Sequence, residues 1–303
     1  MDNKILISVI IPTYGSCVFL REAIESILKQ TFEHWELIVV DDNDPDSVFR
    51  KETECILNNY LLNDTRIKYI KHDYNRNGAV ARNTGFAVAQ GKYISLLDSD
   101  DEYLPNRLKR CYEEMEVAPG NVAGVYTGCE FRRGGETYYV EERVPSGSFM
   151  VETLACKFMF CTGSNIFVRK SVVDELNGFD PKFLRHQDYE FLVRVFQKYS
   201  LIGIPETLVV KNNENVNVPD VEKLANIKTQ YLEKFKNIIN NLSDKEVSFI
   251  YQSNYIEVAE TAMSQNKFRQ ANEYYKKARQ YGNLPMRIWF RRIVFPLYNM
   301  LRK

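Results

Sequence analysis

Residues 92–101 read KYISLLDSDD, an apolar run typical of a β-strand that ends abruptly in a group of carboxylates. Two earlier apolar runs, residues 5–11 and 36–40, also end in polar clusters. Continuous apolar strands separated by helical patterns indicate a parallel sheet that is covered by helices on both faces. Ligands of such sheets bind beyond the carboxyl ends of the strands, so we expect the three clusters to converge on one crevice.

Acidic side chains dominate two of these clusters. Asp41 and Asp42 follow the second apolar run, and Asp98, Asp100 and Asp101 follow the third. Carboxylates gathered without matching bases repel one another, so they call for a cation. Oxygen ligands of this kind suit a hard divalent ion such as Mg²⁺ or Mn²⁺. The sequence therefore predicts a site for a metal-bound phosphorylated ligand.

Four motifs, in their order and approximate spacing, resemble those of family 2 glycosyltransferases. They are Ser8-Val9-Ile10-Ile11-Pro12-Thr13-Tyr14, Val40-Asp41-Asp42, Asn77-Gly78 with Ala81-Arg82-Asn83-Thr84-Gly85, and Asp98-Ser99-Asp100-Asp101. The resemblance covers about residues 4–215. It implies an α/β GT-A fold, with a mostly parallel sheet flanked by helices. It also implies inverting transfer of a sugar from a nucleotide sugar, with a UDP-hexose or UDP-N-acetylhexosamine as the expected donor.

The resemblance also assigns residues to the donor side. Asp100 is similar to the family's metal ligand, and Asp98 would point toward the ribose. A carboxylate at Asp42 or Asp41 would accept the uracil imide N–H; because adjacent strand residues face opposite sides, the sequence leaves open which one faces inward. Arg82 resembles the family's nucleotide-side arginine, the alternative being an exposed surface arginine. A strand-end aspartate can also simply cap the following turn.

Four more residues complete the expected nucleotide-sugar contacts. Tyr14 would lie against the base or the ribose, and the backbone of Pro12 and Thr13 would form the pocket wall. Ser99 lies between the two aspartates of the Asp-x-Asp motif.

An inverting transfer needs a base that takes the proton of the acceptor hydroxyl. Asp188, in a segment that resembles the family's acidic motif before a helix, is the expected base, with Glu190 as the fallback. The alternative makes Asp188 the helix N-cap. His186 would border the acceptor. Residues 161–165 resemble a segment that lines the acceptor or donor-sugar side.

The composition is that of an ordinary soluble globular protein. Hydrophobic residues make up 45% and charged residues 26% of the 303 positions. Forty basic and forty acidic residues give no formal net charge, which argues against a nucleic-acid binder. Six cysteines without a C-x-x-C pair indicate reduced thiols in the cytoplasm. The chain leads straight into a predicted strand, so we expect no signal peptide, and no apolar run is long enough to span a membrane.

The helical patterns set the expected domain boundary. We expect a catalytic domain over residues 1–215 and a helical region over 216–303, because the pattern becomes almost wholly helical from about residue 220. Small and large apolar residues within 246–282 match one tetratricopeptide-like hairpin, although an ordinary antiparallel helix pair fits as well. Earlier in the chain, further strands are expected at 66–70, 122–131, 136–144 and 165–168, and helices at 79–89, 149–160, 171–176 and 188–199.

The end of the chain is basic. No acidic residue follows Glu273, while the first 273 residues carry 32 basic and 40 acidic side chains. Residues 285–303 combine helically spaced apolar residues with basic ones, which predicts peripheral contact with an anionic membrane on its cytoplasmic face. The alternative is a terminal helix that docks on the preceding hairpin. With the resemblance, this tail suggests a glycan or lipid-linked acceptor in bacterial surface-polysaccharide synthesis, for O-antigen or capsule.

Two other classes of function compete with this interpretation. An aspartyl phosphotransferase would use an aspartyl nucleophile in Asp98-Ser99-Asp100, but the later Lys and Ser/Thr motifs that it needs are not present in order. A catalytically degenerate scaffold that acts through its helical tail is disfavoured by the intact Asp98, Asp100 and Asp188. The sequence does not define the oligomeric state, so a homo-oligomer stays open.

Overall fold

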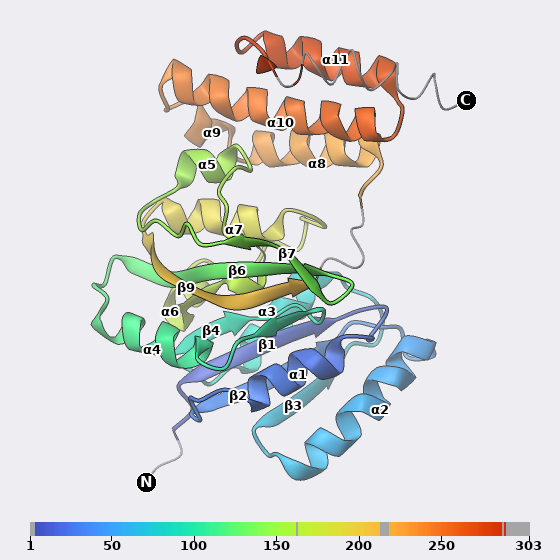
Figure 1. Cartoon of the computed structure of the whole chain (residues 1–303), viewed down its shortest axis with the longest axis vertical. Helices are drawn as coiled ribbons and strands as arrows, with labels where there is room; N and C mark the ends of the chain where they lie inside the picture. The colour runs from blue at the N-terminus through green and yellow to red at the C-terminus, as the bar shows by residue number, and fades with distance from the viewer. Residues whose placement is uncertain (1–3, 162, 213–217, 287, 289–303) are drawn as a thin grey trace. The chain divides into compact units, whose positions relative to one another are not determined.

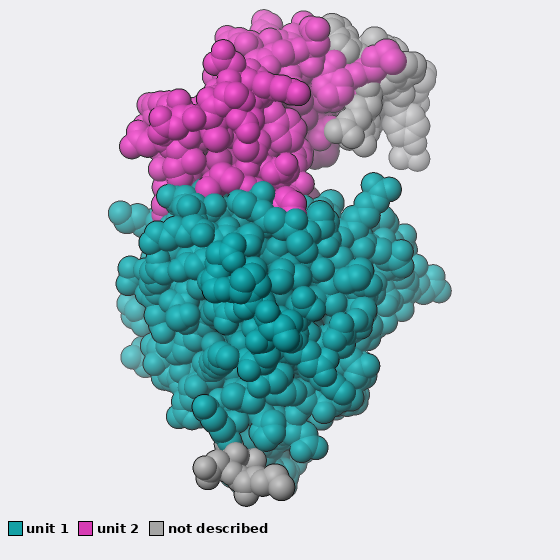
Figure 2. Space-filling model, turned by 90° about the vertical axis from the view of Figure 1, so that its left-hand side faces the viewer, with its two compact units in different colours: residues 1–148, 159–215 teal, residues 149–158, 216–303 magenta. Residues whose placement is uncertain are grey.

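The computed structural model describes residues 4–161, 163–212, 218–286 and 288. The chain divides into two compact units, coloured teal and magenta in Figure 2. Unit 1 comprises residues 1–148 and 159–215, and unit 2 comprises residues 149–158 and 216–303. Each unit has a hydrophobic core of its own. The internal segment 149–158 therefore belongs with the C-terminal helices.

Four parallel strands form the first part of the unit 1 sheet (Figure 1). They are β1 (Ile7–Thr13), β2 (Trp35–Asp41), β3 (Ile67–Lys71) and β4 (Tyr93–Leu96), in the order β3-β2-β1-β4. Ile10 pairs with Ile38 on one side and with Leu96 on the other, so these strands end at the same edge. β1, β2 and β4 are buried along almost their whole length, which explains why their sequences are continuous apolar runs.

The sheet continues beyond β4 with strands of mixed direction. They are β8 (Phe167–Arg169), β6 (Val122–Arg133), β9 (Ser200–Asn212) and β5 (Asp101–Tyr103), while β7 (Glu136–Glu141) forms a hairpin with β6. β8 runs antiparallel to β4, and β5 runs antiparallel to β9. The sequence pattern did not predict β5 and β9. β5 has only three residues, and Pro205 interrupts the apolar pattern of β9.

Helices cover both faces of this sheet. They are α1 (Leu20–Leu28), α2 (Val48–Asn63), α3 (Gly78–Val88), α4 (Arg107–Val117), α6 (Lys170–Glu175) and α7 (Gln187–Phe196). α1, α2 and α4 share a core with Val9 and Val39 on one face. α3 lies on the other face, where a Cβ at Gly85 would come within 2.5 Å of Ile10 Cγ2. Glycine therefore allows α3 to approach β1 closely.

Unit 2 is helical. It contains α5 (Met150–Leu154), α8 (Val221–Lys234), α9 (Lys236–Ile239), α10 (Asp244–Ser264) and α11 (Phe268–Arg279). Ser243 and Glu246 form a capping box that begins α10. α10 and α11 form the expected hairpin, with Ala259 and Ala278 fully buried between larger side chains. A tetratricopeptide-like role for this hairpin stays a prediction.

The α/β class with a helical C-terminal region is confirmed. The predicted helix at 149–160 is wrong in extent, because α5 ends at Leu154 and Cys156 adopts a left-handed φ of 52°. Most of the predicted tail at 285–303 lies outside the described residues, although Ile288 is buried in the unit 2 core. In the part of the chain that the structure describes, no helix has the length and apolar character needed to cross a membrane.

Candidate active site

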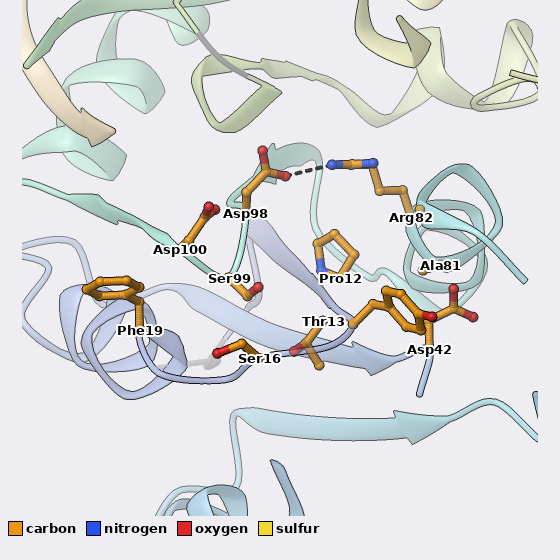
Figure 3. Close-up of a pocket in the computed structure, with 12 residues that line it drawn as sticks. Pro12, Thr13, Ser16, Phe19, Asp42, Ala81, Arg82, Asp98, Ser99 and Asp100 are labelled. Atoms are coloured by element: carbon orange, nitrogen blue, oxygen red, sulfur yellow. Dashed lines mark hydrogen bonds and ion pairs between the residues drawn. The ribbon is translucent and has the colours of Figure 1, made fainter. Parts of the chain in front are cut away.

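The carboxyl ends of β1, β2 and β4 open onto one pocket of about 430 Å³ in unit 1 (Figure 3). Its lining consists of Pro12, Thr13, Tyr14, Ser16, Phe19, Asp42, Gly78, Ala81, Arg82, Asp98, Ser99 and Asp100. The structure thus brings together every residue predicted for the donor side except Asp41. The side-chain oxygen Thr13 Oγ1 is buried and has no hydrogen-bond partner among the described residues. It is a polar atom that the fold itself does not use.

An ion pair crosses this pocket. Arg82 Nη2 donates a 2.6 Å hydrogen bond to Asp98 Oδ1, as Figure 3 shows, and Arg82 Nη1 donates to Gln187 Oε1 at 2.9 Å. Burial raises the pKa of the Asp100 carboxyl, and the Asp98 carboxylate raises it further, while Lys211 opposes both. The negative charge of Asp100 is therefore unfavourable in the protein alone, and a bound cation would stabilise it.

Asp41 faces away from the pocket. Its carboxylate is fully buried, lies 3.1 Å from Arg50 Nε, and accepts a 2.5 Å hydrogen bond from the Tyr69 hydroxyl. Asn43 also donates to it through its backbone and side-chain nitrogens. This network ties the end of β2 to α2 and β3, so Asp41 serves the fold.

Asp42, by contrast, lines the pocket and is held rigidly there. Its carboxylate lies 2.7 Å from His72 Nδ1 and accepts hydrogen bonds from the Arg76 backbone N–H at 2.8 Å and from Asn75 Nδ2 at 3.0 Å. His72 Nε2 in turn lies 2.9 Å from Thr84 Oγ1 in α3. A carboxylate has about four acceptor positions, so about one remains for a ligand.

A second pocket of about 300 Å³ adjoins the first and shares Gly78, Arg82 and Asp98 with it. The rest of its lining is Gly163, Phe179, Leu184, Arg185, His186, Gln187 and Asp188. Arg82 and Asp98, the ion pair drawn in Figure 3, therefore belong to both linings. A molecule in the first pocket and another in the second would therefore meet at these two side chains.

Asp188 lies in the first turn of α7. The helix begins at Gln187, and its N-cap is His186 in a left-handed conformation with φ of 59°. The alternative prediction that Asp188 is the N-cap is therefore wrong. Its carboxylate accepts a 2.9 Å hydrogen bond from the Tyr189 backbone N–H. Burial raises the pKa of Asp188 and Asp98 adds to the increase, while the Arg82 guanidinium opposes it.

The other acceptor-side candidates fall in different places. Glu190 is fully buried, lies 2.7 Å from Arg194 Nε, and lines neither pocket, so its environment is that of a structural ion pair. His186 lines the second pocket. From the segment 161–165, Gly163 reaches this lining, and Thr162 lies outside the described residues.

Comparison with known proteins identifies the family. The sequence model of glycosyl transferase family 2 matches residues 8–176, which contain β1, the end of β2, the Arg82 segment and the Asp98–Asp100 motif. This chain belongs to glycosyltransferase family 2.

Relatives of this glycosyltransferase occur in bacteria and archaea. Over 209 residues it is 38% identical to the UDP-Glc:alpha-D-GlcNAc-diphosphoundecaprenol beta-1,3-glucosyltransferase WfgD of Escherichia coli, covering 67% of this chain and 74% of WfgD. It is 28% identical over 258 residues to the uncharacterized glycosyltransferase MJ1057 of Methanocaldococcus jannaschii, covering 80% and 82% of the two chains. The putative teichuronic acid biosynthesis glycosyltransferase TuaG of Bacillus subtilis is 33% identical, but the match covers only 48% of this chain and 53% of TuaG.

The fold is shared with a solved structure. Residues 1–349 of TarS from S. aureus, in complex with UDP-GlcNAc, superimpose with a TM-score of 0.60 and 16% identity, covering 91% of this chain and 90% of that chain. The GT-A fold predicted for this glycosyltransferase is confirmed.

The carboxylates of the first pocket suit a divalent ion that is bound together with a ligand. Among the residues that the structure describes, no three His, Cys, Asp or Glu side chains are grouped to hold a metal ion. Asp98 and Asp100 do offer two carboxylates to the first pocket. Mg²⁺ is commonly held by one or two carboxylates plus substrate phosphates, so this donor set suits an ion that arrives with a diphosphate.

Sequence reasoning missed Lys211, and it did not assign to Ser164 its contact with the acidic segment. Ser164 Oγ donates to Asp101 Oδ2 at 2.6 Å, and Lys211 Nζ lies 3.8 Å from the same oxygen. Burial raises the pKa of Asp101 to about 7, against the opposing effect of Lys211. Asp101 and Lys211 face each other in the β5–β9 pairing. Only recognition of β9 as the partner of β5 could have found Lys211.

Proposed function

We propose that this glycosyltransferase transfers a hexose or N-acetylhexosamine from a UDP-sugar, with inversion, to a glycan or lipid-linked oligosaccharide in the synthesis of a bacterial surface polysaccharide. The observation that carries the proposal is the pair of adjoining pockets. Asp42 and Asp100 line the first, Asp188 lines the second, and Arg82 and Asp98 belong to both. This arrangement suits a donor and an acceptor that react where the pockets meet.

The first pocket would bind the nucleotide. The remaining acceptor position of Asp42 suits the imide N–H of uracil, which cytosine lacks. Tyr14 is 63% exposed at the pocket and offers a ring face to the base or ribose, while the unused Thr13 hydroxyl suits a sugar oxygen. UDP-Glc in the name of WfgD and UDP-GlcNAc in the TarS complex support a UDP-sugar donor.

The Asp98–Asp100 segment would face the diphosphate. Asp100 would be the metal ligand, Asp98 would face the ribose, and Ser99 lies between them. A bound Mn²⁺ or Mg²⁺ would supply charge neutralisation of the leaving diphosphate. Arg82 sits beside Asp98 and adds a fixed positive charge on the nucleotide side.

Asp188 would act as the base. The acceptor hydroxyl oxygen forms a bond to the anomeric carbon as the bond from that carbon to the diphosphate oxygen breaks, and the hydroxyl proton passes to Asp188. Attack opposite the leaving group inverts the anomeric configuration. The raised pKa of Asp188 makes it a stronger proton acceptor than an exposed aspartate. His186 would border the acceptor.

The names of two relatives support the proposed acceptor. The name of WfgD mentions a sugar that is linked to diphosphoundecaprenol, and the name of TuaG mentions teichuronic acid biosynthesis. Both support a glycan acceptor of the cell surface. We place the enzyme in the cytoplasm, at the inner face of the membrane, with residues 285–303 as the anionic-lipid contact. Within this scheme residues 1–215 are the catalytic domain and residues 216–303 the helical region.

A panel of nucleotide sugars tests the proposal. Full-length protein is titrated with UDP-glucose, UDP-galactose, UDP-GlcNAc, UDP-GalNAc and GDP-mannose, with and without Mn²⁺, and UDP release is measured with a lipid-linked oligosaccharide acceptor. We expect tighter binding of one or more UDP-sugars with Mn²⁺, and UDP release that depends on the acceptor. Preference for GDP-mannose, or phosphorylation of an aspartate in place of sugar transfer, would contradict the proposal.

A further inference from the structure

Unit 2 contains a pocket of its own, far along the sequence from the residues of the active site. The cavity has a volume of about 160 Å³ and lies between α8, α10 and α11. Its lining consists of Ala225, Lys228, Thr229, Leu232, Glu233, Tyr251, Tyr255, Val258, Tyr274 and Lys277. All of these residues belong to unit 2, so the pocket is complete within that unit.

Aromatic rings dominate one side of this pocket. Tyr255 lies at the centre, with ring centroids of Tyr251 at 6.3 Å, Tyr274 at 6.5 Å and Tyr281 at 6.0 Å. Tyr251 and Tyr281 stack at 4.9 Å with an interplanar angle of 15°. These rings are half-buried and form an aromatic wall along the helix pair.

Three tyrosines of this wall have hydroxyl groups that are available to a ligand. Across the described ranges, the hydroxyls of Tyr251, Tyr255 and Tyr274 make no hydrogen bond to the protein. Because these rings are only half-buried, their hydroxyls can form hydrogen bonds to solvent or to a ligand in the pocket. Lys277 Nζ lies 4.6 Å from the ring centroid of Tyr274, and Lys277 is one of the residues that line the pocket.

The charges of the lining are nearly balanced. Lys228 is only 3% exposed and forms a 2.8 Å ion pair with Glu257, so its charge is neutralised within the unit. Lys277 and Glu233 are the other charged lining residues, and they have opposite signs. A phosphate or nucleotide would need an excess of positive charge, which this lining does not provide.

We propose that this pocket is a saccharide-binding site that takes one uncharged hexose or N-acetylhexosamine ring of a glycan. A pyranose ring has an apolar C–H face, which suits the face of a tyrosine ring, and a rim of hydroxyls that both donate and accept hydrogen bonds. The tyrosine hydroxyls, the Lys277 ammonium and the Glu233 carboxylate supply both kinds of partner. The site is separate from both pockets of unit 1 and does not depend on which donor or acceptor the enzyme uses.

Binding of free oligosaccharides tests the site without any catalytic step. The probes are laminarihexaose, a β-1,3-linked glucose hexamer, and chitohexaose, a β-1,4-linked N-acetylglucosamine hexamer. Each is titrated into full-length protein without nucleotide or metal, and binding is followed by saturation-transfer NMR. We expect at least one probe to bind, and Tyr274→Leu and Lys277→Met to weaken that binding by about tenfold, equivalent to about 1.4 kcal/mol. Tyr255→Phe keeps the ring, and with it the packing of the wall, and should weaken binding less.

Two control variants separate this site from others. Tyr138→Leu removes a tyrosine that is 54% exposed on β7, and Asp188→Asn changes the second pocket of unit 1. Both should bind the probe as the wild type does. The proposal is overturned if neither probe binds, if Tyr274→Leu binds as tightly as the wild type, or if Asp188→Asn loses the binding instead. None of these outcomes depends on sugar transfer, so they leave the proposed function to its own test.

Discussion

Ser164 holds Asp101 by a 2.6 Å hydrogen bond, and its hydroxyl oxygen also accepts the backbone N–H of Asp98 at 2.9 Å. One buried hydroxyl thus joins the turn beside the second pocket to the acidic segment of the first. Its own carbonyl accepts hydrogen bonds from the Tyr103 hydroxyl at 3.0 Å and from Arg107 Nη2 at 3.3 Å. Ser164 therefore fixes the acidic segment relative to the turn at residues 163–165.

Ser164→Ala should lower both stability and activity. Losing a buried hydrogen bond costs about 1–3 kcal/mol, and the released Asp98–Asp101 segment should raise the Mn²⁺ concentration needed for half-maximal rate. Thermal unfolding and metal-dependent turnover measure the two effects. Ser264→Ala, an exposed serine in α10, is the matched control and should change neither. An unchanged metal requirement in Ser164→Ala would restrict Ser164 to a structural role.

Asp100→Ala should abolish turnover and the Mn²⁺-dependent part of nucleotide binding. The ion that neutralises the diphosphate would lose its protein ligand. Calorimetric titration of UDP with and without Mn²⁺ measures the binding. Turnover at the wild-type level in this variant would rule out Asp100 as the metal ligand.

Asp188→Asn should reduce kcat by about 10²–10⁴-fold, the usual contribution of a general base, with donor binding nearly intact. The amide keeps the size and hydrogen bonding of the carboxylate but cannot take the proton. Steady-state kinetics together with direct donor titration separate the two quantities. A collapse of donor affinity would mean that Asp188 holds the sugar or the fold instead.

The pH dependence of kcat/KM should report the environment of Asp188. Only the deprotonated carboxylate can accept a proton, so activity falls as the pH drops below the pKa of Asp188. Burial raises this pKa, so the acid limb should lie above the ordinary aspartate value of about 3.9. Arg82→Gln removes a charge that lowers the pKa, so the acid limb of its profile should shift to higher pH. A shift to lower pH would exclude Asp188 as the titrating base.

The same substitution should affect different properties at Asp41 and at Asp42: protein stability at Asp41 and nucleotide preference at Asp42. Asp41→Asn breaks the buried pair with Arg50 and should destabilise the protein by about 3–5 kcal/mol, with the preference for UDP over CDP unchanged. Asp42→Asn should instead reduce that preference, because an amide can donate to cytosine as well as accept from uracil. Denaturant unfolding and nucleotide competition distinguish the two. Loss of UDP preference in Asp41→Asn alone would reverse the assignment.

Local pattern was enough to predict the parallel half of the sheet but not the rest. Continuous apolar runs such as residues 36–40 are typical of buried strands. The order of the motifs then indicated that the carboxyl ends of these strands lie close together. The partners of β5 lie more than 100 residues away in β9, and three residues are too few to give a periodic signal. The choice between Asp41 and Asp42 depended on which side of β2 each faces, which only the three-dimensional packing of α2 and β3 decides.

The helix α5 is bound by residues that the ribosome synthesises much later than the helix itself. Its backbone carbonyls at Thr153 and Leu154 are bound by the side chains of Tyr231 and Asn254, which lie 78 and 100 residues further along the chain. At 5–20 residues per second, a ribosome needs roughly 4–20 s to make those partners after it has made α5. During that interval Leu154, which is fully buried in the folded protein, lacks the packing that α10 gives to α5. A fragment that stops at residue 215 would lack α10 and both side chains that bind α5, so we expect such a fragment to need a chaperone or to aggregate.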